Sequence, residues 1–463
     1  MPEFCNHCND YSRSEVLRAA IAEAGRGLPA IEPGMPLPAG TGLTRRSFVA
    51  RSAGMLLSVY GASKLPLRAF EEGIAQAAVD APKTPVLVTI FLSGGADALN
   101  VLFPAGDPLY AQYRPNIKLD PSGAKPVAED GRLYWHPSLG GLSQLYDEGK
   151  VTLLPSVGYT HPDQSHFTSR HFWEVGATDA SLMTGWMGRF LDSVGVPDNP
   201  LQGLALDTRL APALASSKVP VSAIDATDKY TFSANGVNDA AVTNRMIETI
   251  AALAVPADPS EPALVQASAA VRQSAELRAQ LASFNTDGAS FNVPASYPAT
   301  GTFAKRLAGL AALIGAGLPL KCVALTAPGG YDTHSAEAAS LANGLKQTSD
   351  TLLAFQRDLE QRGVADGVLT LVWSEFGRRA RENGSAGTDH GAAGVGFLVG
   401  TRTPGRMIGQ YAGLQGGLDS QGNLVPTSDF RGVYSSLLEQ WFGFDASQVI
   451  PDAASFARVK VVR

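Results

Sequence analysis

Residues 85–100, PVLVTIFLSGGADALN, decide the fold, because an unbroken apolar run ends there in Gly94-Gly95 and then Asp97. A short apolar run bounded by turn residues is typical of a buried strand. Glycine permits the backbone angles of a tight turn, so the chain can bend directly after this strand. The stretch therefore predicts a strand over 86–92 with a polar group just past its end.

Three further stretches repeat this arrangement of an apolar run followed by polar side chains. They are VTLLPSVGYTHPDQSH at 151–166, LKCVALTAPGGYDTHS at 320–335 and GVLTLVWSEFGRR at 367–379, the last followed by GTDHGAAG at 387–394. In an open parallel α/β sheet, ligands bind beyond the carboxyl ends of the strands. We therefore expect these polar residues to meet at one edge of one sheet.

Strands and helices alternate through the rest of the chain. Helices are predicted over 304–316 and 335–362, and strands over 320–326, 368–373 and 395–399. This alternation predicts an α/β fold with a doubly wound, mostly parallel sheet flanked by helices. The Ala-rich segment 238–286 predicts helix, and we interpret 238–300 as a helical insertion that covers the site.

The composition of the 463 residues is globular and slightly acidic, with a net charge of −6 and 45% hydrophobic residues. This length fits either two or three domains or one large domain with insertions. Phosphate neutralisation needs a basic face, so the acidic balance argues against a nucleic-acid partner. A stable membrane span needs about 20 apolar residues, and we predict none.

Residues 44–50, TRRSFVA, place Arg45 and Arg46 ahead of a modest apolar stretch and the small residues AQAA at 75–78. This order is that of a bacterial twin-arginine signal, which predicts the twin-arginine translocase as a partner and a periplasmic or secreted location. An amphipathic helix with two surface arginines is the alternative. The predicted parts are a disordered leader at 1–43, a signal region at 44–80 and a main domain at 81–463.

Three cysteines occur in the chain. Cys5 and Cys8 form CNHC with His7, which is either a metal or redox pair or a short exposed segment without such a role. A closed zinc site needs about four ligands, which favours the second interpretation. Cys322 lies in an apolar run and predicts a small buried side chain. The main domain therefore has no internal disulfide.

Asp332 and His334 lie two residues apart after a Gly-Gly pair, so both can face one ion from an extended backbone. Carboxylate oxygen and imidazole nitrogen together suit zinc, manganese or iron. Asp97 is either a metal carboxylate at a strand end or the N-cap of the following helix. Asp389 and His390 lie in the Gly-rich stretch NGSAGTDHGAAG, which we interpret as a functional loop without a packing role.

Glu375 ends an apolar strand, where a carboxylate can bind metal, and Arg378 follows three residues later. An arginine there can hold an anionic oxygen pair, and a surface salt bridge to Glu375 is the alternative. Ser165 and His166 lie in HPDQSHFTSRHF, where a serine beside a metal is a candidate nucleophile. We predict catalytic roles for Ser165, His166 and Arg378, and metal ligands at Asp97, Asp332, His334, Glu375, Asp389 and His390.

Together these motifs resemble a bacterial family known as domain of unknown function 1501, within the alkaline-phosphatase-like superfamily. The resemblance rests on TRRSF, FLSGGADALN, SHF with a following Trp, TGWMGRFLD, GGYDTH, WSEFGRR and GTDHGAAG, in order from residue 44 to about 400. It implies an α/β sheet with two divalent metals at the strand ends. It also implies hydrolysis or transfer of phosphate and sulfate esters through a Ser, a Thr or a modified Cys.

By position, the resemblance implies metal roles for Asp97, Asp332, His334, Glu375 and His390. Phe376 departs from the pattern, because a histidine usually follows the strand-end carboxylate. We expect an exported hydrolase with a divalent metal (zinc, manganese or calcium) that acts on an anionic small-molecule or glycan ester. The alternative is a non-catalytic secreted binding or assembly protein on a degenerate hydrolase fold, which Phe376 and the weak serine motif favour.

Overall fold

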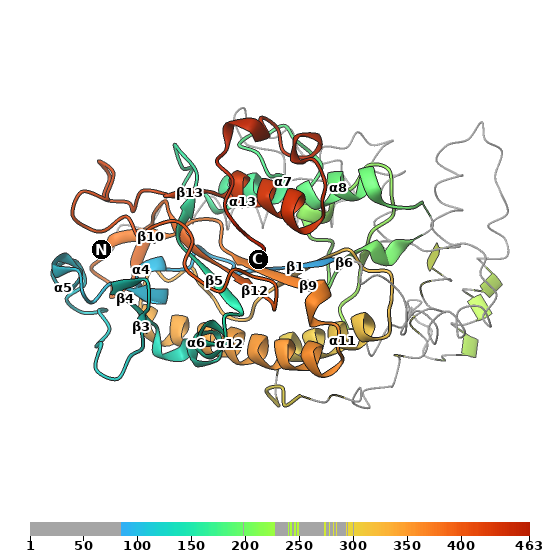
Figure 1. The fold of residues 1–463 in the computed structure, drawn as a ribbon, viewed down its shortest axis with the longest axis horizontal. Helices are drawn as coiled ribbons and strands as arrows, with labels where there is room; N and C mark the ends of the chain where they lie inside the picture. Colours follow the sequence, from blue (N-terminus) through green and yellow to red (C-terminus); the bar gives the residue numbers. More distant parts are fainter. Residues whose placement is uncertain are drawn as a thin grey trace.

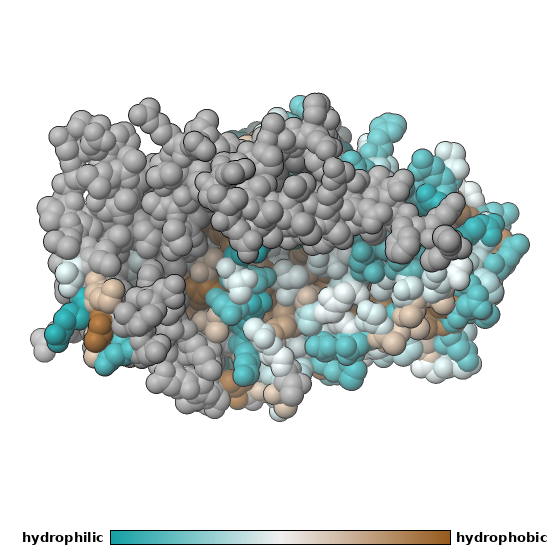
Figure 2. All heavy atoms as spheres, turned by 180° about the vertical axis from the view of Figure 1, so that it is seen from behind, coloured by the Kyte–Doolittle hydropathy of each residue, from teal (hydrophilic) through white to brown (hydrophobic). Residues whose placement is uncertain are grey.

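The computed structural model describes residues 85–197, 199–226 and 301–463, with scattered positions between 239 and 299. The predicted twin-arginine signal, the CNHC segment and most of the predicted insertion at 238–300 lie outside the described residues. Within the described ranges, no helix is both long and apolar enough to cross a membrane. The described surface seen in Figure 2 mixes hydrophilic and hydrophobic residues, as folded proteins commonly do.

Among the described residues, eight strands form a central sheet in the order β13-β5-β12-β9-β1-β8-β6-β7 (Figure 1). The strands are β1 (Val86–Phe91), β5 (Val151–Gly158), β6 (Gly203–Ala205), β7 (Ser222–Ala223), β8 (Cys322–Thr326), β9 (Val368–Trp373), β12 (Gly394–Val399) and β13 (Ser428–Asp429). Only β12 within this sheet runs antiparallel to its neighbours. The predicted mostly parallel sheet is confirmed.

Helices cover both faces of the sheet (Figure 1). They are α6 (Gly140–Asp147), α11 (Thr302–Gly315) and α12 (Glu337–Gln361) on one face, and α7 (His166–Val175), α8 (Trp186–Val194) and α13 (Phe430–Ser436) on the other. Successive side chains of a strand point to opposite faces. Val88 and Ile90 of β1 accordingly pack in the core between the sheet and α12, whereas Leu87 and Phe91 pack with the aromatic residues of α7 and α8. A strand buried on both sides reads as a continuous apolar run, which explains the sequence of β1.

Smaller elements surround the sheet. The short helices are α4 (Ala98–Val101) and α5 (Pro108–Tyr113), and the minor strands are β2 (Leu102–Phe103), β3 (Pro126–Val127), β4 (Asp130–Trp135), β10 (Arg378–Glu382) and β11 (Thr388–His390). Short helical turns are η1 (Pro137–Leu139), η2 (Pro200–Gln202), η3 (Pro212–Leu214), η5 (Ala365–Gly367), η6 (Leu437–Trp441), η7 (Ala446–Gln448) and η8 (Ala453–Ser455). Near the end of the chain, α13 continues directly into the π-helical turn η6.

The Gly-rich stretch around residue 389 differs from its prediction as a loop without a packing role. Residues Thr388–His390 form β11, which pairs with β10 in a two-stranded sheet. A Cβ atom added at Gly387 would lie 2.4 Å from the carbonyl carbon of His334, and one at Gly391 would lie 2.4 Å from that of Arg378. Glycine is needed here because two backbones pass so closely that no side chain fits between them.

Strands β1, β8 and β9 are adjacent and parallel, so their carboxyl ends lie at one edge of the sheet. Asp97 follows β1, Asp332 follows β8, and Glu375 follows β9. The structure therefore brings the chain segments of three predicted site residues to the same edge, which is where open α/β sheets bind their ligands.

Candidate metal centre

Three histidines surround one carboxylate oxygen at this edge. Asp332 Oδ1 lies 3.3 Å from His166 Nε2, 3.1 Å from His334 Nε2 and 3.5 Å from His390 Nε2. The Nε2 atoms of His334 and His390 are 2.9 Å apart. We call these four residues the histidine cluster. They come from the first residue of α7, the loop after β8 and the end of β11.

The spacing of the histidine cluster fits a metal ion. In a tetrahedral site with metal–ligand distances of about 2.1 Å, neighbouring ligand atoms lie about 3.4 Å apart. The three distances to Asp332 Oδ1 lie close to that value, and the ligand atoms of His166, Asp332 and His390 all lie within 4.8 Å of one another. Imidazole and carboxylate ligands together suit zinc and other divalent transition metals. The residues present therefore fit the divalent ion that the sequence predicted.

The outer nitrogens of two histidines are held by oxygen atoms. His166 Nδ1 lies 2.8 Å from Glu375 Oε1, and His390 Nδ1 lies 2.7 Å from the backbone oxygen of Gln164. These acceptors favour the tautomer with a proton on Nδ1, which turns the lone pair of Nε2 toward Asp332. Metal-binding histidines are generally fixed in this way by a carboxylate or a carbonyl group.

Glu375 is a buried outer partner of the histidine cluster. Its carboxylate accepts hydrogen bonds of 3.0 Å from both Gly94 N and Gly95 N. Both glycines have positive φ angles, of 120° and 72°, and this turn aims two N–H groups at the carboxylate. Burial opposes ionisation of Glu375, but the hydrogen bond with His166 outweighs it and lowers the pKa. In the structure Glu375 contacts the far nitrogen of His166, Nδ1. It therefore supports a candidate ligand instead of occupying the metal-ligand position that the sequence predicted for it.

Arg378 lies buried beneath the cluster, with 1% of its surface exposed. Its Nε donates to Gly95 O at 2.8 Å, and Nη1 donates to Thr388 O at 2.9 Å. Nη2 donates to Asp332 Oδ1 at 2.6 Å. The alternative of a surface salt bridge to Glu375 is wrong, because this guanidinium is buried and pairs with Asp332. Its donors are directed at protein oxygens, which favours positioning of Asp332 over direct contact with a substrate.

Opposing effects set the charges in the histidine cluster. Burial alone would lower the pKa of His166, but hydrogen bonds with Asp332 and Glu375 raise it to about 9. Burial would raise the pKa of Asp332, whereas the three histidines and Arg378 hold it far below its usual range. Burial lowers the pKa of His390. At neutral pH Asp332 is therefore charged and His390 is neutral, which are the forms that bind a cation, whereas His166 holds a proton that a metal ion would displace on binding.

Asp97 lies in a different set of contacts. Both of its oxygens accept from the guanidinium of Arg114, with Arg114 Nη2 at 2.8 Å from Oδ1, and both side chains are fully buried. Oδ1 also accepts from Leu99 N at 3.3 Å as the N-cap of α4. Burial would raise the pKa of Asp97, but Arg114 outweighs burial and lowers it. Of the two interpretations from the sequence, the structure shows the N-cap.

Glu337, which the sequence did not indicate, lies buried beside Asp97 in the first turn of α12. It accepts from Thr388 Oγ1 at 2.7 Å, from Thr333 Oγ1 at 3.3 Å and from Asn100 Nδ2 at 2.8 Å. Burial, followed by the charge of Asp97, raises the pKa of Glu337 to about 8. We call Asp97, Arg114 and Glu337 the buried network. Its threonine contacts join the two segments that carry the cluster, because Thr333 lies between Asp332 and His334 and Thr388 lies two residues before His390.

The remaining predicted residues lie at the rim of the cluster. Asp389 Oδ1 lies 3.4 Å from His334 Nδ1, and its side chain is half exposed. Ser165 is the N-cap residue of α7, directly before His166, but its hydroxyl does not cap the helix. The ring of Phe376 packs 4.9 Å from the rings of both His166 and His390 and closes the cluster on one side. The structure therefore places Ser165 and Asp389 next to the cluster and Phe376 in its wall.

Comparison with known proteins connects the chain to one family. The family described as "Protein of unknown function (DUF1501)" matches residues 152–451. This range contains the whole histidine cluster together with Glu375 and Arg378. No curated protein matches the chain.

Several solved structures align with most of the chain at low identity. A protein of the alkaline phosphatase superfamily from Vibrio parahaemolyticus is 10% identical over 86% of this chain and 80% of its own, with a TM-score of 0.36. The lipoteichoic acid synthase LtaP from Listeria monocytogenes is 9% identical over 87% and 79%, with a TM-score of 0.33. The PsFucS1 sulfatase from Pseudoalteromonas sp. is 10% identical over 87% and 78%, with a TM-score of 0.34.

Proposed function

The chain belongs to the DUF1501 family of proteins of unknown function, and we propose that it is a metal-dependent hydrolase of phosphate or sulfate esters. One observation carries this proposal: three imidazole nitrogens lie within 3.5 Å of one oxygen of Asp332 at the carboxyl edge of the sheet. The proposed ligands are His166, Asp332, His334 and His390. Glu375, Arg378 and Asp389 hold these ligands in place.

In this proposal the chain supplies the nucleophile. A divalent ion held by His166, Asp332, His334 and His390 would supply Lewis-acid stabilisation of charge and would lower the pKa of a nearby hydroxyl or water. Ser165 lies one residue before His166, and its hydroxyl is the proposed nucleophile. A bond forms between Ser165 Oγ and phosphorus or sulfur, the bond to the ester oxygen breaks, and the hydroxyl proton ends on the leaving alcohol. Water then hydrolyses the seryl ester and restores Ser165.

His166 serves in this proposal as a metal ligand, whereas the sequence predicted a catalytic role for it. Its Nδ1 faces Glu375 at 2.8 Å, so Nε2 is the atom turned toward Asp332. A base must reach the proton that it removes, and a nitrogen that coordinates metal cannot accept one. The catalytic group of this proposal is therefore Ser165, with direct attack by water as the alternative route.

A non-catalytic binding or assembly role is the second candidate. Arg378 favours it, because its N–H groups are directed at backbone oxygens and Asp332, where a hydrolase needs cationic groups for the anionic part of its substrate. Phe376 also favours it, since an apolar ring occupies one wall of the cluster. Under this second proposal the histidine cluster binds metal and stabilises the fold without turnover.

The deciding experiment measures metal and activity separately. Protein purified without added metal is analysed for bound elements and then tested on phosphate and sulfate esters of 4-nitrophenol. We expect bound zinc or manganese and hydrolysis of one ester class. His334→Ala should lower both the metal content and the activity, whereas Ser165→Ala should keep the metal and lose turnover. Metal without hydrolysis supports the binding role, and wild-type metal content in His334→Ala overturns the site itself.

Export is a separate proposal. The order of Arg45, Arg46, a modest apolar stretch and AQAA supports recognition by the twin-arginine translocase and a periplasmic or secreted location. Receptors read the paired arginines themselves, and so a change that keeps the charge should still block export. Changing both arginines to lysine should retain the protein in the cytoplasm in cell fractionation. Unchanged export of this variant would refute the proposal.

A further inference from the structure

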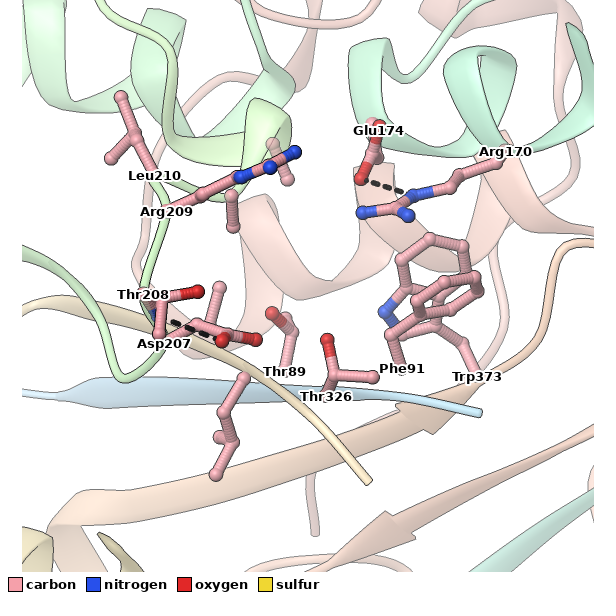
Figure 3. A pocket seen from close by; sticks show the side chains of 14 residues that line it. Thr89, Phe91, Arg170, Glu174, Asp207, Thr208, Arg209, Leu210, Thr326 and Trp373 are labelled. Carbon is pink, nitrogen blue, oxygen red and sulfur yellow. Dashed lines mark hydrogen bonds and ion pairs between the residues drawn. The ribbon is translucent and has the colours of Figure 1, made fainter. Parts of the chain in front are cut away.

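A cavity of about 210 Å³ lies beside the sheet, on the face covered by α7 (Figure 3). Its polar lining consists of Thr89 from β1, Thr326 from β8, Arg170 and Glu174 from α7, and Asp207, Thr208 and Arg209 from the loop after β6. Trp373, the last residue of β9, forms part of the wall. The cavity therefore opens at the carboxyl ends of the same strands that lead into the histidine cluster.

Helix α7 links the cavity to the histidine cluster. Arg170 follows His166 by four residues, so the two side chains project from the same face of the helix, about 6 Å apart along its axis. Trp373 precedes Glu375 by two residues on the neighbouring strand end. Helix α7 and the end of β9 therefore each carry residues of both sites.

Arg170 is held in a fixed position at this cavity. Its Nε donates to Glu174 Oε1 at 2.8 Å, and its guanidinium lies 4.7 Å from the centre of the Phe91 ring. Its side chain is nevertheless 41% exposed, whereas Glu174 is buried. An arginine fixed by a buried carboxylate and an aromatic ring loses little side-chain entropy when it binds a ligand.

Arg209 reaches over the cavity from the opposite side (Figure 3). Asp207, the acid nearest to it in the sequence, forms an ion pair with Arg306 at 3.4 Å instead. Glu174 is paired with Arg170 and Asp207 with Arg306, so Arg209 is the lining cation for which the described residues show no acidic partner, and an anion in the cavity would supply one. The geometry of the lining thus favours an anionic ligand over a neutral one.

We propose that this cavity binds a second anionic oxygen group of the substrate, a carboxylate or sulfate set back from the ester that is cleaved. The inference rests on the proposed function, because it assigns the cavity to the same substrate. Arg170 and Arg209 donate to this group, and guanidinium groups pair well with planar or tetrahedral oxyanions. The substrate class is then an ester with two anionic groups separated by about one helical turn or slightly more.

Binding of two matched compounds tests the cavity without requiring turnover. The compounds are 4-sulfobenzoate, which carries two anionic groups, and benzenesulfonate, which lacks the carboxylate. Isothermal titration calorimetry is done on the metal-loaded wild type, on Arg209→Ala and on Arg406→Ala, an exposed arginine beside β5 as a control. Wild type and Arg406→Ala should bind 4-sulfobenzoate about tenfold more tightly than benzenesulfonate, the effect of roughly one charge-assisted hydrogen bond. Arg209→Ala should bind the two compounds equally.

Benzene-1,4-disulfonate distinguishes the two sources of the anionic group. A stronger preference for the disulfonate assigns a sulfate, and a stronger preference for 4-sulfobenzoate assigns a carboxylate. Equal binding of the one-anion and two-anion compounds by wild type, or an unchanged preference in Arg209→Ala, overturns the proposal. If the preference depends on Arg209 but no ester is ever cleaved, the proposed hydrolase function fails while the anion-binding cavity remains.

Discussion

The histidine cluster and the buried network begin from the same sequence pattern and end in different chemistry. Gly94-Gly95-Ala96-Asp97 follows β1, and Gly329-Gly330-Tyr331-Asp332 follows the adjacent strand β8. Asp97 is fully buried and both of its oxygens pair with Arg114. Asp332 is 42% exposed on its side chain and has three imidazoles around one oxygen.

The difference shows how a strand-end aspartate becomes structural or functional. A buried carboxylate is stable when a cation of the protein itself pairs with it. The buried network has such a cation in Arg114, which also donates to Ala380 O at 3.0 Å and so joins α5 to β10. The histidine cluster brings together groups that bind cations, and Arg378 pairs with it from outside through Asp332 Oδ1. The predictions that follow separate stability, which should depend on the network, from metal binding, which should depend on the cluster.

The largest expected effect is on stability when Arg114 is replaced. Arg114→Met leaves Asp97 buried without its partner, and breaking a buried ion pair in this way costs about 3–5 kcal/mol. Urea unfolding of the metal-free protein measures the loss. Arg132→Met is the control, because its pair with Asp130 is exposed at the surface and should contribute at most about 1 kcal/mol. Equal losses of unfolding free energy in the two variants would show that the buried Arg114–Asp97 pair stabilises the fold no more than an exposed pair does.

Metal affinity should fall next most strongly when a cluster imidazole is removed. His390→Ala should weaken zinc binding at least about a hundredfold and abolish the rise in melting temperature on addition of zinc, since a ligand that binds only the folded state stabilises it. His161→Asn is the matched control. His161 is an exposed histidine with a positive φ angle, which asparagine also tolerates. Full zinc affinity in His390→Ala would show that the cluster is not the metal site.

A smaller loss is expected from the outer partner of His166. Glu375→Gln keeps the shape of the side chain but weakens the acceptor for His166 Nδ1, and changes of this kind typically reduce metal affinity about 10- to 100-fold. Glu382→Gln is the control, since Glu382 also accepts a backbone N–H bond, from Asn116 at 2.9 Å, but lies on the far end of β10. Competition with a zinc chelator measures both variants. An affinity in Glu375→Gln as low as that in His390→Ala would instead make Glu375 a direct ligand.

The sequence predicted the longer strands of the central sheet well, because buried strands are recognisable as short apolar runs between turn residues, but it did not predict the short strands β6, β7 and β13. The predicted strands at 86–92, 368–373 and 395–399 differ from the observed bounds by at most one residue. The antiparallel direction of β12 was not predicted. The segment between β9 and β12 forms the small β10–β11 sheet and not a crossover helix, and a parallel neighbour would need such a crossover.

Prediction of the site was less complete because it depends on contacts between distant residues. Asp332, His334 and His390 were grouped correctly by their positions after strand ends and in a Gly-rich stretch. Arg114 and Glu337 carry no pattern that separates them from ordinary surface residues of helices, and only the fold places them beside Asp97. The local sequence also cannot show that Glu375 accepts hydrogen bonds from two backbone N–H groups 281 and 280 residues away, or that it contacts His166.

The finest expected effect is the pH dependence of stability that Glu337 confers. Its pKa rises from 4.5 in the unfolded chain to about 8 in the folded protein, through burial and then the charge of Asp97. Between these values the folded state holds one more proton than the unfolded state, so the free energy of unfolding falls as pH rises. The contribution is complete below pH 4.5 and is lost as pH passes about 8. A neutral side chain at this position cannot show that loss.

Glu337→Gln tests this dependence because glutamine resembles the protonated acid. The variant loses one acceptor for Asn100 or Thr388 at every pH, so its absolute stability should be lower by about 1 kcal/mol at pH 5. The difference from wild type should then shrink or reverse between pH 5 and pH 9, because only wild type loses stability there. Urea unfolding of both metal-free proteins at several pH values measures the difference. A constant difference across this range would show that Glu337 does not keep a proton in the folded protein. In that case both carboxylates of the buried network, Asp97 and Glu337, would be ionised, and Arg114 would be the one cation of the network that balances them.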